Sequence, residues 1–378
     1  MFIGGSFCFS GQPAVLGVRR WELARVFQKR SFVQRLGRDR PSVRAYSTTA
    51  ALMVLRRPSL AHGEYLVSAP YATSGAPRVC YLGFAMSRRA VVFGAAGQLG
   101  TELVRDLKSR GFAVLACDRA GVDIANPAAV ESALAGYDAE VVFNAAAYNQ
   151  VDVAEQEPQA AFLINALAVR NLALACRQVD AQLVHFSTDY VFDGMARHPY
   201  VEDDLPHPLG AYAVSKLAGE LYAQAYLDRA LTVRTSGVYG LGGLATARGN
   251  FVELMLRLAA SPTPIRVVED HVASPTYAPL LAARTIDLVE RGLSGLFHIS
   301  GGVPISWPNF ARLIFETAGV HPTLLEANER EYRTPARRPR YSALSNGKME
   351  RAGLAPMPPI RDALAEYFAG RATTAARK

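Results

Sequence analysis

Apolar and polar positions follow two alternating patterns from residue 90 to about residue 240. Short apolar runs predict buried strands at 90–93, 113–117, 140–143, 182–186 and 231–234. Between these runs, helical spacing of apolar residues predicts helices at 99–110, 127–135, 158–178 and 212–226. Apolar strands that alternate with helices are typical of βαβ units and a parallel sheet. The pattern therefore predicts an α/β fold, a doubly wound parallel sheet of the Rossmann type with helices on both faces.

Beyond residue 240 the alternation weakens. Gly and Pro become frequent, and the apolar runs at 265–268 and 296–299 are short. We expect residues 241–378 to form a smaller C-terminal lobe that closes over the carboxyl ends of the strands, and residues 86–240 to form the sheet domain. Ligands of such sheets bind outside those strand ends, so the chemistry is expected where the two parts meet.

Residues 1–85 show neither a strand period nor a helix period. They are rich in Arg, Ser, Gly and Pro and hold twelve basic but only three acidic residues. We expect a disordered extension outside the fold. It is either a product of a start codon placed too early or a transit peptide, whose composition it shares. Met86-Ser87-Arg88-Arg89 directly before a strand favours the first explanation.

Charge and cysteine content narrow the class of protein. The net charge of +8 comes from the first 85 residues, because the remainder holds 29 basic and 30 acidic residues. The body therefore lacks the basic surface of a nucleic-acid-binding protein. No uninterrupted apolar run reaches the roughly 18 residues typical of a membrane helix. The four cysteines form no CxxC pair and no zinc spacing, which favours a reduced, cytoplasmic protein without a metal cluster. A true transit peptide would instead indicate an organelle.

A glycine-rich loop follows the first predicted strand. Gly94, Gly97 and Gly100 form a GxxGxxG that opens a helix. In a βαβ unit, such glycines permit a tight turn and close approach of the backbone to a pyrophosphate. The helix N-terminus adds N–H groups and a positive dipole end. The sequence therefore predicts a dinucleotide at this loop, and residues 86–240 become an NAD(P)-binding domain.

The residues after the second strand leave the choice of cofactor open. Asp118 could accept the ribose hydroxyls of NADH. Arg119 could instead pair with the 2′-phosphate of NADPH. Asp123-Ile124 lies in a following loop, where we expect it beside the adenine.

A Tyr–Lys pair carries the strongest catalytic signal. Tyr212 and Lys216 are four residues apart on one face of a predicted helix. A nearby ammonium lowers the pKa of a phenol and makes it a usable proton donor. Thr188 follows the strand that ends at Phe186, at the carboxyl edge of the sheet. We expect Thr188 to hold a substrate carbonyl while Tyr212 delivers a proton.

Several blocks, taken in order, resemble the dTDP-4-dehydrorhamnose reductase family of extended short-chain dehydrogenases. The resemblance covers residues 88–370 and is carried by 94–100, 144–152, 187–194, 212–216, 234–236, 274–277 and 336–339. It implies reduction of the 4-keto group of dTDP-6-deoxy-L-lyxo-4-hexulose by NADPH or NADH. It also implies that residues 241–378 bind substrate.

Residue roles follow from the matching motifs. The resemblance implies cofactor contacts at Gly97, Gln98, Leu99, Asp118, Asp123, Ile124, Ala147, Tyr148, Asn149, Phe186, Tyr212 and Lys216. It implies substrate contacts at Thr188, Asp189 and Tyr190, with Tyr212 as the proton donor. Some members use magnesium held by glutamates at a dimer contact, and no residue of this chain is assigned to such an ion.

Four positions depart from the family pattern. Gly237 stands where the family has a Trp that packs by the sugar, and Asn149 stands where Thr is common. His271 and Ala273 replace the usual Gln and Gly. The departures leave the hydride chemistry in place and bear on which sugar is bound.

The interpretation is therefore a reductase that acts on a nucleotide-activated deoxysugar, as a monomer or homodimer. One alternative is a nucleotide-sugar epimerase or dehydratase that retains NAD. Another is a regulatory binding subunit like that of methionine adenosyltransferase, which resembles this family. Turnover of a 4-keto sugar nucleotide would separate them.

Overall fold

The computed structural model describes residues 53–56, 65–68, 87–245, 249–328 and 334–375. The chain divides into two units, Met1–Met86 and Ser87–Lys378. In the first unit, β1 (Met53–Arg56) and β2 (Tyr65–Ser68) pair antiparallel, and the sequence pattern did not predict them. The rest of the expected N-terminal extension lies outside the described residues.

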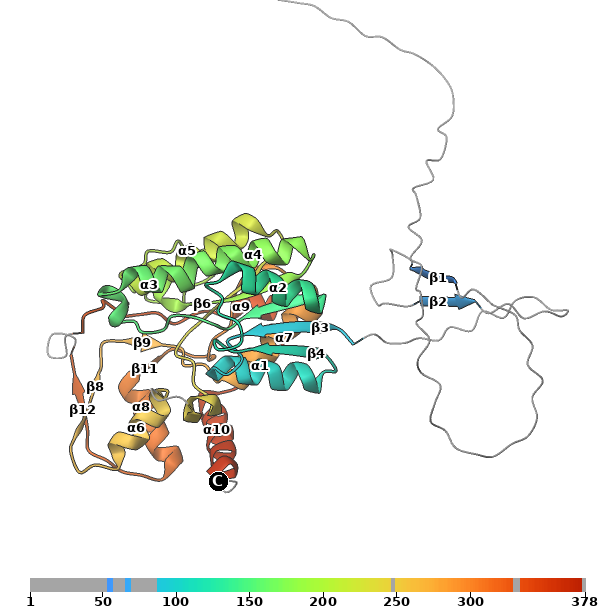
Figure 1. Ribbon diagram of the computed structural model, residues 1–378. Helices are drawn as coiled ribbons and strands as arrows, with labels where there is room; N and C mark the ends of the chain where they lie inside the picture. The colour runs from blue at the N-terminus through green and yellow to red at the C-terminus, as the bar shows by residue number, and fades with distance from the viewer. Residues whose placement is uncertain (1–52, 57–64, 69–86, 246–248, 329–333, 376–378) are drawn as a thin grey trace, which may run out of the picture. The chain divides into compact units, whose positions relative to one another are not determined.

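The second unit is built on a six-stranded sheet (Figure 1). Its strands are β3 (Arg89–Phe93), β4 (Ala113–Cys117), β5 (Val141–Asn144), β6 (Gln182–Thr188), β7 (Leu231–Thr235) and β10 (Gly295–His298). Their order is β10-β7-β6-β5-β3-β4, and every neighbouring pair is parallel. The predicted parallel sheet is confirmed. The chain reverses its direction of progress across the sheet between β3 and β5, the point where such sheets bind ligands.

Helices cover both faces because successive strand residues point to opposite sides. One apolar core joins Ala90 and Val92 to helices α1 (Gln98–Ser109), α7 (Ala278–Glu290) and α9 (Gly347–Arg351). The other joins Val91 and Phe93 to α2 (Pro127–Tyr137), α4 (Ala168–Gln178) and α5 (Ala211–Tyr226). The doubly wound arrangement is therefore confirmed.

The long predicted helix at 158–178 contains an irregular turn. It consists of α3 (Pro158–Phe162), a π-helical turn η2 (Leu163–Leu167) and α4. By length and composition, Pro158–Gln178 is the one helix among the described residues that is apolar enough to cross a membrane. Half of its apolar window is buried inside the fold, which is also typical of a core helix of a globular domain.

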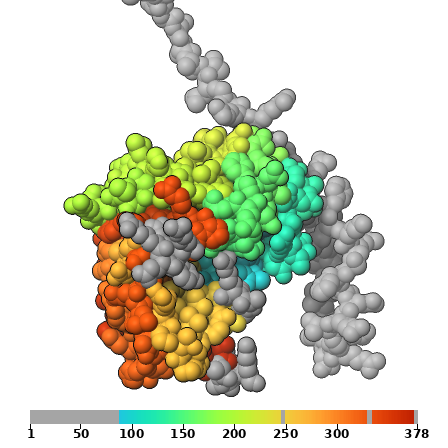
Figure 2. All heavy atoms as spheres, turned by 90° about the vertical axis from the view of Figure 1, so that its left-hand side faces the viewer, coloured from blue at the N-terminus to red at the C-terminus, as the bar shows by residue number. Residues whose placement is uncertain are grey.

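Most of the remaining elements form a lobe with its own core. They are η4 (Leu241–Ala245), α6 (Phe251–Ala259), β8 (Ile265–Val268), β9 (Val272–Ala273), β11 (Ile305–Ser306), α8 (Trp307–Ala318), β12 (Leu324–Ala327) and α10 (Ile360–Ala375). β8 pairs with β12 and β9 with β11, around a core that includes Tyr239, Phe310 and Tyr367. In Figure 2 the yellow and orange atoms of this lobe lie below the green and cyan atoms of the sheet domain.

The two parts interleave along the chain. β10, α7 and α9 lie beyond residue 240 but belong to the sheet and its covering layer. A division into residues 86–240 and 241–378 stays a prediction.

Candidate active site

The glycine-rich loop brings the backbone of β3 close to that of β5. Gly94 has a φ of +74°, a left-handed conformation that favours glycine, and a Cβ there would lie 2.6 Å from the amide nitrogen of Ala146. A Cβ at Gly100 would collide with the carbonyl oxygen of Gly94. The loop therefore has no side chains over its backbone at these glycines and leads directly into the N-terminus of α1, where unpaired N–H groups attract phosphates.

A cavity of about 310 Å³ opens at this loop, where the strand order reverses. Its lining holds nine of the predicted cofactor residues: Gly94, Gly97, Asp118, Arg119, Asp123, Ile124, Ala147, Tyr148 and Asn149. Ala96, Val122, Ala145, Ala146 and Ile164 complete it. The structure thus gathers residues from three separate loops and the π-helical turn η2 into one site whose form suits a dinucleotide.

The charged residues of this cavity are on its rim. Asp118 and Arg119 are both exposed, and Asp118 Oδ1 accepts a hydrogen bond from the Gly121 amide at 2.8 Å. Asp123 similarly accepts one from the Ala125 amide at 3.0 Å. Each carboxylate therefore shapes its own turn while its remaining oxygen stays available to a ligand.

Gln98, Leu99 and Gly100 were also predicted to touch the cofactor, but their side chains do not line the cavity. Gln98 reaches away from it to the backbone of Val238 and Gly240. Leu99 packs against the core between the sheet and α1. A contact to the cofactor from these residues would come from the backbone of the first helical turn.

Helix α5 places Tyr212 and Lys216 in the interior. The Tyr212 hydroxyl donates to Asn149 Oδ1 at 3.4 Å, and Lys216 Nζ donates to the carbonyl of Phe186 at 2.5 Å. Burial lowers the pKa of Lys216 to about 8, opposed by the carboxylate of Glu220. Phe186, which was predicted to contact the cofactor, therefore binds Lys216 through its backbone carbonyl.

Burial also raises the pKa of Tyr212, and a hydrogen bond with the Thr188 hydroxyl opposes that shift. The direction is opposite to the one expected from the sequence, because burial penalises the charged phenolate and the neighbouring Asp189 carboxylate adds to that penalty. The phenol is consequently held in its protonated form, which is the form that a proton donor requires.

Asp189 is the centre of a buried hydrogen-bond cluster. The Thr188 hydroxyl donates to Oδ1 at 3.1 Å, while the hydroxyls of Ser236 and Ser342 donate to Oδ2 at 2.8 and 2.5 Å. Burial raises the pKa of Asp189 to about 6, and the three hydroxyl donors limit that rise. With 3% of its surface exposed, Asp189 is placed to orient Thr188 more than to meet a substrate.

Tyr190 lies beside the proton donor. Its ring meets that of Tyr212 edge-on, with the ring centres 6.1 Å apart. Its hydroxyl interacts with Arg338, whose guanidinium pairs with Asp152 at 2.8 Å. Tyr190 therefore links Tyr212 of the catalytic helix to the Asp152–Arg338 ion pair.

Asn165 is a structural contributor that sequence reasoning missed. It lies in the π-helical turn, where its side chain bonds both the N–H and the C=O of Tyr148 at 2.8 and 3.0 Å. It also donates to the Ser215 hydroxyl at 3.0 Å. A Cβ at Gly219 would collide with the Asn165 carbonyl oxygen, so the glycine allows this close approach. The π-helical turn therefore connects the cavity residue Tyr148 to the catalytic helix α5, and no local sequence motif predicts it.

The departure at Gly237 has a steric reason. Its φ is +49°, and a Cβ there would lie 3.1 Å from the indole ring of Trp307 and 3.3 Å from Pro275. The space that a side chain at this position would need is occupied by Trp307, so a Trp at 237 would require both residues to move.

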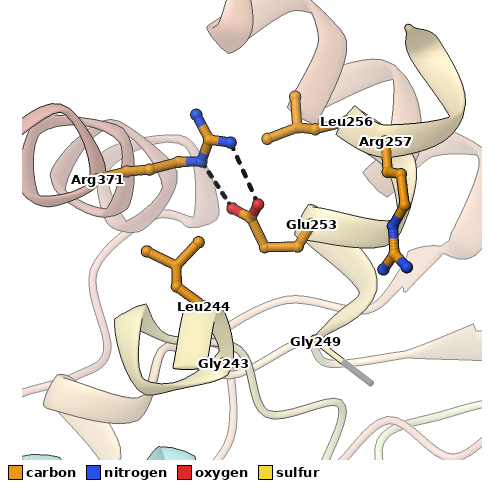
Figure 3. A pocket seen from close by; sticks show the side chains of 7 residues that line it. All are labelled: Gly243, Leu244, Gly249, Glu253, Leu256, Arg257 and Arg371. Atoms are coloured by element: carbon orange, nitrogen blue, oxygen red, sulfur yellow. Dashed lines mark hydrogen bonds and ion pairs between the residues drawn. The ribbon is translucent and has the colours of Figure 1, made fainter. Parts of the chain in front are cut away.

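Two other features lie apart from this site. Among the described residues, no group of three or more His, Cys, Asp or Glu side chains gathers as metal ligands do. A second cavity, of about 360 Å³, lies between α6 and α10, and Figure 3 shows Arg371 facing Glu253 across it. The Glu253 carboxylate is bound by Arg371 at 2.8 and 3.2 Å and by the Tyr367 hydroxyl at 2.5 Å, so it is engaged inside the lobe.

Comparison with known proteins agrees with this geometry. The family model described as the RmlD substrate binding domain matches residues 88–372. The spore coat polysaccharide biosynthesis protein SpsK of Bacillus subtilis is 39% identical over 285 residues, covering 75% of this chain and 98% of its own length. A dTDP-4-dehydrorhamnose reductase of Mycobacterium tuberculosis is 40% identical over 294 residues, covering 76% and 95%. The dTDP-4-dehydrorhamnose reductase of Bacillus anthracis, solved in complex with NADP, superimposes with a TM-score of 0.72 at 34% identity, covering 75% of this chain and all of that one.

Proposed function

The chain belongs to the RmlD substrate binding domain family, and on that premise we propose that it reduces dTDP-4-dehydrorhamnose to dTDP-L-rhamnose with NADPH. Relatives of about 40% identity carry the name dTDP-4-dehydrorhamnose reductase over nearly their whole length. The B. anthracis relative was solved with NADP. NADH remains the second cofactor to test, because Asp118 and Arg119 stand together at the rim of the cavity.

One observation carries the proposal. The protonated phenol of Tyr212 donates to Asn149 Oδ1 at 3.4 Å and interacts with the Thr188 hydroxyl. Asn149 also lines the cavity, so the proton donor lies where the cofactor site and the proton-delivery residues meet. A bare glycine cradle, a helix N-terminus and the Asp118–Arg119 rim form the other end of the same cavity, as a dinucleotide requires.

The residues of this chain account for orientation and proton delivery. A bound dihydronicotinamide supplies a hydride to the keto carbon. Tyr212 donates its phenolic proton to the keto oxygen and becomes a phenolate. Lys216, four residues further along α5, offers the cation that stabilises this phenolate, and the Phe186 carbonyl holds its ammonium in place. Thr188 gives its single hydroxyl proton to Asp189 and interacts with the phenol, so its role is to position the Tyr212 hydroxyl toward the carbonyl.

Asp189 contributes indirectly. When ionised, it accepts three hydroxyl protons and so fixes where the Thr188 hydroxyl points. A protonated Asp189 would bring a donor of its own into the cluster and displace one of these bonds. We therefore assign Asp189 a positioning role toward Thr188, together with Ser236 and Ser342.

The proposal is tested by turnover. The purified chain is mixed with NADPH and dTDP-4-dehydrorhamnose, and the loss of reduced nicotinamide absorbance is compared with the dTDP-L-rhamnose formed. We expect one NADPH oxidised for each product molecule. Product without net NADPH oxidation would indicate an epimerase. Absence of turnover under conditions where both ligands bind would indicate a regulatory binding protein.

The setting of the enzyme stays a prediction. A nucleotide sugar is the expected partner, and the body of the chain gives no reason to expect nucleic acid or membrane. A cytoplasmic location and a monomer or homodimer remain to be measured, as does any use of magnesium.

A further inference from the structure

The first residue of α1 contacts a distant loop with both ends of its side-chain amide. Gln98 Nε2 donates to the carbonyl of Val238 at 2.7 Å. Gln98 Oε1 accepts from the Gly240 amide at 3.1 Å and from Asn250 Nδ2 at 2.9 Å. The partners are 140 to 152 residues away in sequence. Both ends of the amide are therefore engaged by the opposing loop, which uses its oxygen twice and one of the two N–H groups of Nε2.

The opposing loop is shaped to receive this side chain. A Cβ at Gly242 would lie 2.8 Å from Gln98 Cα, and a Cβ at Gly243 would lie 2.5 Å from Gln98 Oε1. Asn250 adds a bond from Nδ2 to the Gly240 carbonyl at 3.0 Å. We call the contact of Gln98 with Val238, Gly240 and Asn250 the Gln98 latch. Close glycine packing around three hydrogen bonds distinguishes the latch from an incidental surface contact.

The latch joins three parts of the proposed enzyme. On one side, Gln98 directly follows Gly97, which lines the cofactor cavity. On the other, Val238 follows Ser236, whose hydroxyl binds Asp189 in the proton-delivery cluster. Asn250 also caps α6, because its Oδ1 accepts a hydrogen bond from the Glu253 amide at 3.0 Å. The latch therefore extends into the lobe.

We infer that Gln98 is a positioning residue that couples cofactor binding at the glycine loop to sugar-nucleotide binding at the lobe. The inference rests on the proposed function. Phosphates at the N-terminus of α1 would restrain Gln98, and through the latch they would restrain Val238, Gly240 and Asn250 in the position that the lobe needs. Coupling between two binding sites is reciprocal, so each ligand should tighten the other by the same factor.

The test is calorimetric and needs no turnover. The Kd of NADPH is measured with and without saturating dTDP, and the Kd of dTDP with and without NADPH. We expect a coupling factor of about 5 to 150 in the unchanged protein. Gln98→Met, which has similar length but no hydrogen bonds, should bring the factor to about 1–2 while leaving the Kd of NADPH alone within about threefold.

A matched control and a second variant complete the design. Thr101→Val removes a hydroxyl that bonds the Ala95 and Gly97 carbonyls inside the same loop, away from the latch. It should leave the coupling factor unchanged. Asn250→Ser keeps a capping hydroxyl for α6 but removes the amide that reaches Gln98. It should lower the factor as Gln98→Met does, and it replaces that variant if Gln98→Met does not fold.

The outcomes separate this inference from the proposed function. A wild-type coupling factor near 1, or an unchanged factor in Gln98→Met and Asn250→Ser, would overturn the latch and leave the reductase activity standing. Loss of thermal stability without a change in coupling would also overturn it, because a purely structural contact behaves that way. Failure of the unchanged protein to bind dTDP or to turn over would reject the proposed function, and the inference with it.

Discussion

The cofactor cavity and the proton-delivery cluster are assembled from the chain in different ways. Every residue that lines the cavity falls between Gly94 and Ile164, in successive loops and one helix of the βαβ units. The cluster around Asp189 draws Ser236 from 47 residues away and Ser342 from 153 residues away. The lining of the cavity thus comes from one contiguous part of the chain, whereas the cluster around Asp189 depends on the fold as a whole.

The difference predicts that the two functions can be damaged separately. A change in the cavity should weaken NADPH binding and leave the rate at saturation nearly intact. A change in the cluster should do the opposite. Lys216 belongs to the proton-delivery region, because its helix α5 carries Tyr212 and its ammonium binds the Phe186 carbonyl in β6.

Lys216→Met should lower kcat more than the substitutions of Asp189, Gly94 and Arg119 do. It removes the cation that stabilises the phenolate, and loss of one such donor typically costs about 10²–10³ in kcat. Because the pKa of Lys216 is about 8, wild-type activity should fall as the pH rises through 8 and the ammonium is lost. Lys216→Arg, which stays charged, should lack that alkaline limb. An alkaline limb that survives in Lys216→Arg would assign it to another group.

Asp189→Asn should lower kcat about 10- to 100-fold, since hydrogen bonds to a charged group contribute about 1.5–3 kcal/mol. The Kd of NADPH should hardly change. Because the pKa of Asp189 is about 6 and the ionised form orients Thr188, wild-type kcat should fall as the pH drops below 6. The variant should lose this acid limb. Asp193→Asn, the same change four residues on, is the control and should keep it.

Gly94→Ala should weaken NADPH binding about tenfold or more and lower the free energy of unfolding by about 1–3 kcal/mol. The added Cβ would be strained by a φ of +74° and would press on the Ala146 amide. Gly111→Ala is the matched control, because its φ is +81° but nothing lies within 4 Å of the added atom. Chemical denaturation and fluorescence titration with NADPH measure both effects. Equal losses in the two variants would show that backbone strain, and not the collision, is responsible.

Arg119→Ala should have the smallest effect, a loss of about fivefold in NADPH affinity with NADH affinity unchanged. An exposed ion pair contributes about 0.2–1 kcal/mol, and only NADPH has the 2′-phosphate. Asp118→Ala should weaken NADH instead, though it also removes the bond to the Gly121 amide that shapes the turn. Identical ratios of the two affinities in wild type and both variants would show that neither side chain reads the ribose.

The sequence predicted the parts of the fold that depend on neighbours along the chain. The strand at 113–117 has the predicted bounds, and the glycine loop and the Tyr212–Lys216 pair lie on the expected elements. The strand expected at 296–299 was assigned to the smaller lobe, but β10 joins the main sheet beside β7. A short apolar run carries no information about its partner, so only the assembled fold could place it.

The remaining features of the site depend on contacts that no local pattern encodes. Ser342 reaches Asp189 only because the C-terminal part of the chain folds back over the sheet. The π-helical turn that aims Asn165 at Tyr148 has the same apolar spacing as an ordinary helix. The direction of the pKa shift at Tyr212 was mistaken for a related reason, since it depends on burial that the sequence does not specify.

The most direct test of the account is a pair of measurements on Tyr212→Phe, namely kcat with the 4-keto sugar nucleotide and the Kd of NADPH. The substitution removes one hydroxyl and keeps the ring that packs edge-on to Tyr190. We predict a fall in kcat of about 10²–10⁴-fold, as for a positioned general acid, with the Kd of NADPH unchanged within about twofold. Wild-type turnover in Tyr212→Phe would contradict the account, because the proton would then come from elsewhere.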